Sequence, residues 1–343
     1  MNKYWNNLND EIKKYFSILS PEFPEWLNEY INTNELLRLN YISTTCGTIY
    51  SDLFDNNFSF STLDHSVAVA LIVWNFTHDK KQTLSGLFHD IATPTFKHCV
   101  DFLNGDYMIQ ESTEDMTTEI IKNSDKIIKL LNKDNIKISD VDNYHLYPIA
   151  DNDTPKLSAD RLEYSLSNAL FHYKLLDIDE IKEIYKDICI QRNEEHELEL
   201  GFQKEENAIK FVEFTSKLSI IYREDRTRYS MQLLADILKR LNNDKKISKK
   251  DLYKLKEEQV IKIIEESKYS KIFNTWKKAL KIKTSKEEPK NVYYVHQGAK
   301  IRYINPLYNG KRISECSKKA KKMIEENLSY DMNNYVYLDI DFE

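Results

Sequence analysis

The stretch LSGLFHDIATPTFKHCVDFLNGD, residues 84–106, places an adjacent histidine and aspartate, His89 and Asp90, inside an apolar run. An ionised carboxylate is costly to bury unless it has a partner, and binding a metal ion is one way to meet that cost. The alternative is an ordinary helix end, at which Asp90 caps the next turn. Because short motifs often occur by chance, the dipeptide taken alone favours this second interpretation.

The second half of the same stretch carries signals for both ends of a helix. Thr93 precedes a proline; threonine is a good N-cap, and proline suits the first position of a helix. About three turns later, the Asn-Gly pair at 104–105 is typical of a helix end. The pattern predicts a helix over residues 94–104 that holds His98 and Asp101 on one side.

The composition favours helices over strands. The 343 residues include only 6 Gly and 7 Pro, and Leu, Ile, Lys, Glu and Asn are abundant. A chain of this length can bury a sizeable core. We therefore expect a mainly α fold, with a helical bundle as its core and additional helices around it.

Charge, cysteine spacing and hydropathy restrict the partners and the compartment. The net charge of −6 comes without a basic stripe of the kind that long nucleic acids require, so a nucleic-acid partner is not expected. The four cysteines lie far apart without CxxC spacing, which fits reduced thiols. No apolar leader and no apolar run of 18 residues occur, so we expect no membrane partner and a cytoplasmic location.

Two regions differ in character along the chain. Residues 63–76, LDHSVAVALIVWNF, are apolar on nearly every side and predict a buried helix. After residue 290, segments rich in Tyr, Val and Ile surround an amphipathic segment at 316–328 and predict a small β-β-α-β unit. The expected organisation is a helical domain over 1–288 and a small α/β unit over 289–343. Further helical patterns cover residues 80–91, 115–132, 157–176, 179–190, 205–222, 228–242 and 256–269.

A polar face marks the predicted helix SADRLEYSLSNALFHY, residues 158–173. Asp160, Tyr164 and Asn168 recur every four residues on one side, while leucines form a stripe on roughly the opposite side. The leucine stripe suits the core. The polar face suits either solvent or a functional site.

Four side chains could together hold a divalent metal ion: His65, His89, Asp90 and Asp160. Each lies in a predicted helix, and buried helices can project such ligands inward from several directions. Neutral imidazole and ionised carboxylate suit Mn, Fe, Co, Ni, Zn and, less well, Mg. The ligand types do not choose among these metals, nor between one ion and two.

The motifs LDHSVAVA, LFHDIATPTFKH and SADRLEYSL resemble, in type and order, the signature of the HD-domain metal-dependent phosphohydrolases. They are most similar to the branch that contains bacterial dGTP triphosphohydrolases and the SAM-and-HD-domain dNTP triphosphohydrolase. The segment ELLRLNYISTTCG (35–47) resembles that branch's first helix, and KIRYINPLYNGKRISE is similar to the ending of bacterial HD hydrolases. The resemblance implies an HD-domain helical core, the four metal ligands above, and metal-activated water that attacks phosphorus.

Further site residues follow from the resemblance alone. It implies that His98, Asp101 and Glu111 are catalytic residues close to the metal. Tyr164 falls where the branch has a tyrosine beside the substrate, and Asn168 falls where it has an aspartate near the sugar.

The chain also departs from the branch's pattern. Thr93 and Gln110 stand where the branch usually has histidines, and Thr62 stands where it has an arginine. Thr45 replaces a sugar-reading glutamine, so Thr93 and Thr45 are candidates for substrate contact. Since losing a general acid costs roughly 10²- to 10⁴-fold in rate, the chain is either slow on dNTPs or built for another substrate.

Other basic side chains and histidines have no pattern that assigns them to the site. Lys97, Arg161 and the arginines at 223–228 are expected to be surface or structural residues. The same is expected of the remaining histidines: His78, His145, His172, His196 and His296.

The expected function is metal-dependent hydrolysis of a nucleotide or related small phosphate ester, with a (deoxy)nucleoside triphosphate as one candidate substrate. One alternative is a nucleotide-binding regulator that has lost turnover. Another is an HD-type nuclease or cyclic-nucleotide phosphodiesterase. The resemblance also implies a homo-oligomer, because relatives often place nucleotide sites between subunits.

Overall fold

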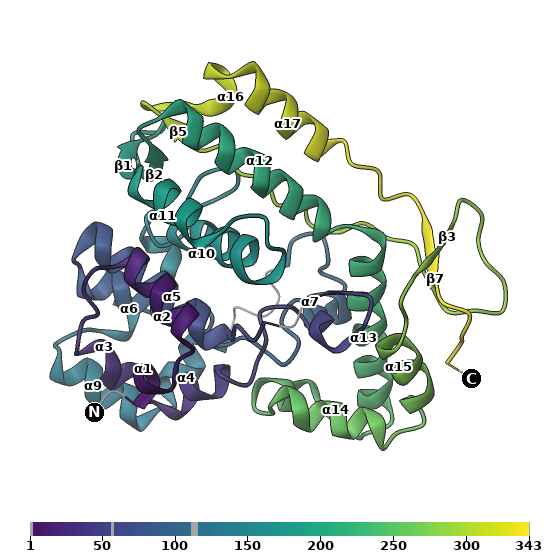
Figure 1. The fold of residues 1–343 in the computed structure, drawn as a ribbon. Coiled ribbons are helices and arrows are strands. Elements are labelled where there is room, and N and C mark those ends of the chain that lie inside the picture. The colour runs from purple at the N-terminus through teal and green to yellow at the C-terminus, as the bar shows by residue number, and fades with distance from the viewer. Residues whose placement is uncertain (1–2, 56–57, 111–115, 343) are drawn as a thin grey trace.

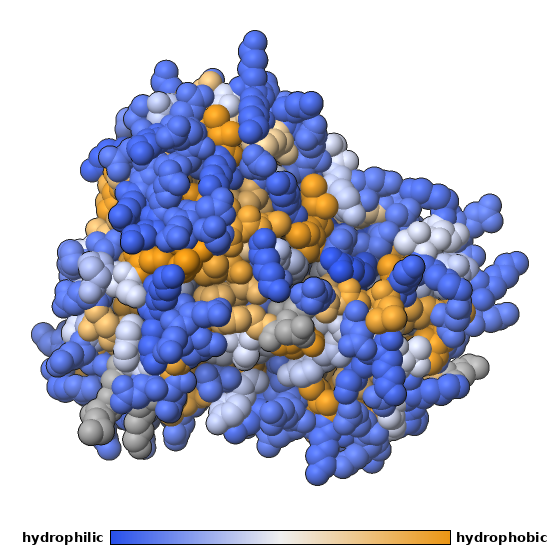
Figure 2. Space-filling view, in the orientation of Figure 1, coloured by the Kyte–Doolittle hydropathy of each residue, from blue (hydrophilic) through white to orange (hydrophobic). Residues whose placement is uncertain are grey.

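A computed structural model of the chain describes residues 3–55, 58–110 and 116–342. The described chain is mainly helical with two small sheets, so the prediction of a mainly α fold is confirmed. Figure 1 shows the N-terminal helices gathered at one side, with α12 and α13 extending away from them. Hydrophilic side chains cover much of this face, and apolar side chains gather across its middle (Figure 2). None of the helices described is long and apolar enough to cross a membrane.

Helix α5 (Thr62–Thr77) forms the centre of the N-terminal half. Its residues 67–73 are all apolar and all buried. Ser61 and Asp64 form a capping box at its start, which satisfies N–H groups that have no partner within the helix. Tyr4 also donates to Asp64 (2.7 Å), so this buried carboxylate is paired.

Helix α6 (Lys80–Phe88) packs against α5 as the second arm of a helical hairpin. His78 ends α5 in the left-handed conformation (φ 46°), and the side chain of Asp79 caps the start of α6. Gly86 allows a close approach, since a Cβ atom there would lie 3.3 Å from a methyl carbon of Val73. The hairpin brings the end of α6 back toward the start of α5.

Helix α10 (Ala159–Ser167) packs against α5 and continues into a π-helical turn at Asn168–His172. Its apolar side joins the large apolar core of this half. The remaining helices of the N-terminal half also contribute to that core: α1 (Lys3–Asn7), α2 (Asp10–Leu19), α3 (Leu27–Ile31), α4 (Asn34–Leu39), α8 (Thr117–Lys122) and α9 (Asp125–Lys133).

A four-stranded sheet and two packed helices, α12 and α17, lie at one end of the molecule (Figure 1). The strand order is β1-β2-β5-β6, with β2 and β5 parallel and the other pairs antiparallel. The elements of this region are α11 (Ile178–Lys186), β1 (Ile188–Arg192), β2 (Leu198–Phe202), α12 (Glu205–Ile221), β5 (Leu307–Tyr308), β6 (Lys311–Arg312), α16 (Ile313–Cys316) and α17 (Lys318–Leu328).

A second apolar cluster surrounds α13 (Asp225–Asn243), against which α7 (Cys99–Asn104) packs. A three-stranded antiparallel sheet of order β3-β7-β4 lies beside it, near the C-terminus in Figure 1. The other elements here are α14 (Glu257–Glu265), α15 (Ser270–Lys277), β3 (Lys283–Ser285), β4 (Tyr294–Val295) and β7 (Tyr335–Tyr337).

The strands after residue 290 do not form one continuous β-β-α-β unit. β5 and β6 extend the sheet of the β1–β2 hairpin, whereas β4 and β7 pair with β3. Strands of two or three residues carry too little local preference to choose a sheet, so tertiary packing decides their partners. The helix predicted over 179–190 ends at Lys186, where the chain turns into β1. The domain boundary at residue 288 stays a prediction.

The helix predicted over 94–104 begins only at Cys99. Phe96 and Lys97 have positive φ angles of 64° and 46°, which a right-handed helix cannot include. Thr93 is therefore not the N-cap of this helix. Gly105 does end it in the left-handed conformation (φ 78°), as the sequence predicts.

Candidate metal centre

Three helices bring His65, His89 and Asp160 together. His65 lies in the first turn of α5, His89 directly follows α6, and Asp160 lies in the first turn of α10. The Nε2 atoms of the two histidines are 3.1 Å apart. Oδ1 of Asp160 is 3.1 Å from Nε2 of His65 and 3.5 Å from Nε2 of His89.

The spacing of these three atoms fits a bound divalent ion. Ligands about 2.1 Å from a metal stand about 3.0 Å apart in octahedral geometry and about 3.4 Å apart in tetrahedral geometry. The observed separations of 3.1–3.5 Å agree with both. Two imidazole nitrogens and a carboxylate oxygen form a candidate metal-binding group, and these donors suit several divalent transition metals.

In each of the two histidines, the other ring nitrogen, Nδ1, forms a hydrogen bond within the protein. Nδ1 of His65 is hydrogen-bonded to the carboxylate of Glu163, and Nδ1 of His89 donates to the carbonyl oxygen of Gly86 (2.7 Å). A proton on Nδ1 leaves the lone pair of Nε2 available for a metal. Both rings are therefore set in the tautomer that ligation through Nε2 requires.

Glu163 is a site residue that the sequence analysis did not identify. It is fully buried and accepts further hydrogen bonds from the hydroxyls of Tyr15 (3.2 Å) and Ser167 (3.3 Å). It follows Asp160 by three residues on α10, and residues at this spacing are neighbours on a helix. In the sequence, the three-residue spacing of Asp160 and Glu163 within DRLEY is the pattern that could have identified Glu163.

Asp90 lies beside the His65, His89 and Asp160 group and forms an ion pair with Lys97. Its Oδ2 atom is 3.7 Å from Nε2 of His65 and 3.8 Å from Nε2 of His89. The ammonium of Lys97 lies 2.7 Å from the same oxygen, and its side chain is only 11% exposed, so Lys97 is not a surface residue. Asp90 stays a predicted fourth ligand, whose carboxylate Lys97 would share with the metal.

The charges of the site favour a cation. Burial lowers the pKa of His65, but the carboxylates of Glu163 and Asp160 outweigh burial and raise this pKa to about 10. Burial also opposes protonation of His89, whereas Asp90 and Asp160 raise its pKa. The surplus of carboxylates draws protons onto both rings, and a divalent ion would satisfy the same carboxylates.

The predicted catalytic residues His98 and Asp101 lie together at the start of α7. Nδ1 of His98 donates to the Asp101 carboxylate (2.9 Å), and Nε2 accepts from Arg302 (3.3 Å). Burial and the Arg302 charge lower the pKa of His98, although Asp101 acts in the opposite direction. His98 is therefore a neutral imidazole with both nitrogens engaged. Glu111, the third predicted catalytic residue, lies outside the described residues.

Arg302 comes from the C-terminal segment and was not anticipated from the sequence. Its Nη2 also donates to Gln110 (2.6 Å), and its guanidinium lies 6.0 Å from the ring centroid of Tyr164. Gln110 and His98 are both neutral, so the described hydrogen bonds leave its charge without a carboxylate partner. An arginine in this state is suited to an anionic ligand.

The polar face of α10 leads from the metal group toward Arg302. Tyr164 lies one turn after Asp160 and contacts the guanidinium of Arg302 with its ring. Asn168 lies one turn further, where the π-helical turn begins, and its amide donates to the carbonyl oxygen of Tyr164 (2.7 Å). Contact of either side chain with substrate stays a prediction.

Thr93 and Thr45 have local partners. The carbonyl oxygen of Thr93 accepts a hydrogen bond from the buried guanidinium of Arg38 (2.5 Å). The hydroxyl of Thr45 is 2.8 Å from that of Ser43 within the same loop. Their assignment to substrate binding also stays a prediction.

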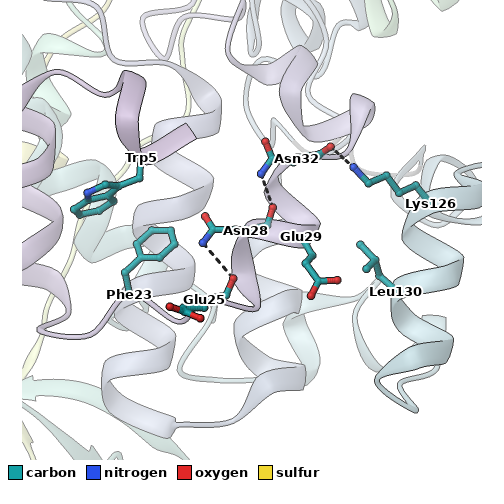
Figure 3. A pocket seen from close by; sticks show the side chains of 8 residues that line it. All are labelled: Trp5, Phe23, Glu25, Asn28, Glu29, Asn32, Lys126 and Leu130. Atoms are coloured by element: carbon teal, nitrogen blue, oxygen red, sulfur yellow. Dashed lines mark hydrogen bonds between the residues drawn. The ribbon is translucent and has the colours of Figure 1, made fainter. Parts of the chain in front are cut away.

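Two surface pockets lie apart from the metal group. The pocket of Figure 3 has a volume of about 650 Å³ and is formed by α1, α3, α9 and the chain between them. A second pocket of about 610 Å³ lies between α2 and residues 170–180. Neither pocket is lined by His65, His89 or Asp160. The candidate metal centre is therefore identified from the convergence of these three side chains and not from a pocket.

Comparisons with known proteins support the fold. No family model matches the chain, and no curated protein matches its sequence. A hypothetical protein from Aquifex aeolicus, 16% identical, superposes with a TM-score of 0.58 over 92% of this chain and 93% of its own. A phosphohydrolase from Bacteroides thetaiotaomicron, 13% identical, superposes with a TM-score of 0.60 over 92% of this chain and 96% of its own. The chain therefore shares its fold with both proteins over nearly their whole length.

Proposed function

We propose that this protein is a metal-dependent phosphohydrolase of the HD type that acts on a nucleotide. The observation that carries the proposal is the position of two cations: Lys97 pairs with Asp90 beside the His65, His89 and Asp160 group, and Arg302 lies by Tyr164, one turn along α10 from Asp160. Cations next to a metal site suit a substrate whose reacting centre carries negative oxygens. The shared fold with a phosphohydrolase is consistent with this function.

A divalent ion at this site would supply hydroxide at neutral pH and polarise a phosphoryl oxygen. The protein's own contribution begins with Glu163 and Gly86, which orient the two histidine rings. Arg302 would bind the non-reacting phosphate oxygens, because its charge has no carboxylate partner among the described residues. Lys97 would stabilise the negative charge that develops on phosphorus.

A nucleotide is the substrate class that the sequence resemblance favours, but the surroundings differ from those of a dNTP triphosphohydrolase. Gln110 occupies a position where a histidine is expected, and it binds Arg302. An arginine from the C-terminal segment thus lies beside the position at which the resemblance implies a histidine that contacts phosphate. This substitution favours a substrate other than a dNTP, or slow turnover of dNTPs.

The test is a hydrolysis screen with the protein purified without chelator and supplied in turn with Mn, Mg, Fe, Co or Ni. Deoxynucleotides, ribonucleotides, cyclic dinucleotides and single-stranded oligomers serve as substrates. We expect metal-dependent release of phosphate or pyrophosphate from at least one nucleotide, and loss of this activity in His89→Ala. Absence of bound metal together with an unchanged phosphatase rate in His89→Ala would overturn the proposal.

The second candidate is a nucleotide-binding regulator without turnover. It is favoured by the threonine at position 93 and by the engagement of both nitrogens of His98. Saturable nucleotide binding in calorimetry, without product over several hours, would support it. Clear metal-dependent turnover would exclude it.

A further inference from the structure

Lys97, which pairs with Asp90 beside the metal group, lies on a turn with an unusual backbone. Phe96 and Lys97 have positive φ angles of 64° and 46°. In residues with a Cβ atom this left-handed conformation is unfavourable, and it persists where surrounding contacts impose it. From this turn the ammonium of Lys97 reaches Oδ2 of Asp90 (2.7 Å). Contacts from outside the turn must therefore hold Lys97 in this position.

The first of these contacts come from the chain just before α14. The N–H of Thr95 donates to the carbonyl oxygen of Leu252 (2.8 Å). The Thr95 hydroxyl also donates to the carbonyl oxygens of Leu252 (3.1 Å) and Leu255 (3.0 Å). Thr95 is fully buried, so its polar groups depend on these partners. The residue before Phe96 is thus fixed to a segment from the second half of the chain.

The loop before α5 holds the side chain of Phe96. The Phe96 ring is fully buried and packs edge-on against Tyr50, with centroids 6.3 Å apart. Gly47, at φ 80°, lies on the same ring, since a Cβ atom there would stand 3.0 Å from a ring carbon of Phe96. The position of the turn therefore depends on the position of residues 47–50.

Glu257, in the first turn of α14, connects this loop to the Lys97 turn. Its side chain is buried, and the residue is only 1% exposed. One carboxylate oxygen accepts from the N–H of Ser43 (3.1 Å), and the other accepts from the hydroxyl of Tyr50 (2.7 Å). A single buried carboxylate thus holds both the start of the loop and the tyrosine on which Phe96 packs.

The same carboxyl lies against the turn itself. Burial raises the pKa of Glu257 to about 7, whereas the N–H of Phe96 and the charge of Lys97 act in the opposite direction, as do Tyr50 and Ser43. The two residues with positive φ angles are therefore close enough to stabilise the ionised form of Glu257.

We propose that Glu257 is a positioning residue that, together with Thr95, holds the turn from which Lys97 reaches Asp90. The inference rests on the proposed function, in which Lys97 acts beside the metal. The hydrogen bonds described for Glu257 go to Ser43 and Tyr50 and not to the metal group, so Glu257 acts through Lys97. Helix α14 would in this way set the strength of the Lys97–Asp90 pair.

A positioning role and a purely structural role predict different results. A structural carboxylate supports the fold, and its loss changes metal binding to the same extent whether Lys97 is present or not. A positioning residue changes metal binding only through Lys97, because Lys97 competes with the ion for Asp90. A double-mutant cycle measures this dependence.

The test is calorimetric titration with Mn²⁺ at pH 8, above the pKa of Glu257. The proteins are the wild type, Glu257→Gln, Lys97→Met and the double variant. We expect Glu257→Gln to bind Mn²⁺ several-fold more tightly, because a displaced Lys97 leaves Asp90 to the ion. Loss of a negative charge alone would weaken the binding of a cation, so the sign separates the two effects. In the Lys97→Met background, Glu257→Gln should give no tightening.

Thr95→Val is the second variant, and it changes no charge. It keeps the branched shape and the backbone N–H but loses the hydroxyl bonds to Leu252 and Leu255. We expect tighter Mn²⁺ binding again, and none of this gain when Lys97 is methionine. Glu258→Gln, at the exposed neighbouring position, is the matched control and should bind Mn²⁺ as the wild type does. Melting temperatures establish that each variant is folded.

Unchanged or weaker Mn²⁺ binding in Glu257→Gln, or a tightening that persists in Lys97→Met, would overturn the positioning role. If Glu257→Gln does not fold, Thr95→Val decides by the same criterion. These measurements use metal binding alone, so a negative hydrolysis screen would overturn the proposed function without changing their outcome. A wild type that binds no Mn²⁺ would overturn both the metal centre and the role of Glu257.

Discussion

The hydrogen bond between Nδ1 of His65 and the carboxylate of Glu163 connects the candidate metal group to the buried core. Tyr15, from helix α2, donates to the other oxygen of Glu163, so a helix far away in sequence also supports the ligand ring. Two residues outside the candidate metal group, Glu163 and Tyr15, thus hold the His65 ring in its orientation.

Replacing Glu163 should weaken metal binding. We expect Glu163→Ala to lower the affinity for Mn²⁺ about 10- to 100-fold, because partners of this kind fix the tautomer and raise the basicity of a ligating histidine. Isothermal titration calorimetry measures the effect. Glu206→Ala, at an exposed position on α12, is the matched control. An unchanged Mn²⁺ affinity in Glu163→Ala would show that the hydrogen bond does not support ligation.

Metal binding should stabilise the fold. An ion present at 100 times its Kd adds about 2.7 kcal/mol to the free energy of unfolding when it binds only the folded state. We expect this gain to disappear in Asp160→Asn and to persist in Asp52→Asn, whose side chain is exposed. Urea unfolding with and without Mn²⁺ measures both. A full gain in Asp160→Asn would place the metal elsewhere.

Lys97 should affect metal and substrate in opposite directions. Its ammonium binds Asp90 beside the metal group, so it repels a divalent ion and competes for a predicted ligand. We expect Lys97→Met to bind Mn²⁺ several-fold more tightly and to raise KM for the phosphate substrate. Calorimetry and steady-state kinetics measure the two changes. A parallel loss of both affinities would instead indicate a structural role for Lys97.

Arg302 should determine the affinity for phosphate. Hydrogen bonds to a charged group contribute about 1.5–3 kcal/mol, so Arg302→Gln should weaken phosphate binding about 10- to 100-fold. Inhibition of the hydrolytic reaction by inorganic phosphate measures the change. Arg302→Lys should be intermediate, since it keeps the charge but not the planar fork. Arg192→Gln on β1, which is exposed, should behave as wild type.

Glu257 should make stability depend on pH. Burial raises the pKa of this carboxyl to about 7, although hydrogen bonds from Tyr50 and from the N–H of Ser43 oppose the rise. The folded protein therefore holds this proton more tightly than the unfolded chain. The contribution is complete below the ordinary pKa of 4.5 and is lost as pH rises from there through 7, by about 3 kcal/mol in total.

The measurement for Glu257 is urea unfolding at pH 5 and pH 8. Glu257→Gln cannot lose the proton, so we expect its stability to fall by roughly 2 kcal/mol less than that of the wild type over this interval. Glu258→Gln, the exposed neighbour, should retain the full dependence. Identical pH profiles for wild type and Glu257→Gln would show that Glu257 is already ionised in the folded protein.

Part of the metal centre was readable from residue types and their order. His65 and Asp160 both lie in the first turns of helices whose patterns are strong, and His89 ends a third. Glu163 could have been added from its spacing to Asp160, because a helix places such residues side by side whatever the rest of the fold does. Arg302 could not have been predicted from the sequence, because a single arginine in a segment of short strands has no periodic relation to the site.

Residue types and their spacing predict the helical class, the positions of the main helices and the three residues of the candidate metal group, because helical periodicity and metal-ligand chemistry are local properties. Packing between distant segments decides that β5 pairs with β2 and β6 with β5, whereas β4 and β7 join the sheet of β3. The same packing places Lys97 against Asp90 and Arg302 against His98. Each of these depends on contacts between segments far apart in the chain, whose free energy comes from burial and charge pairing in the folded state.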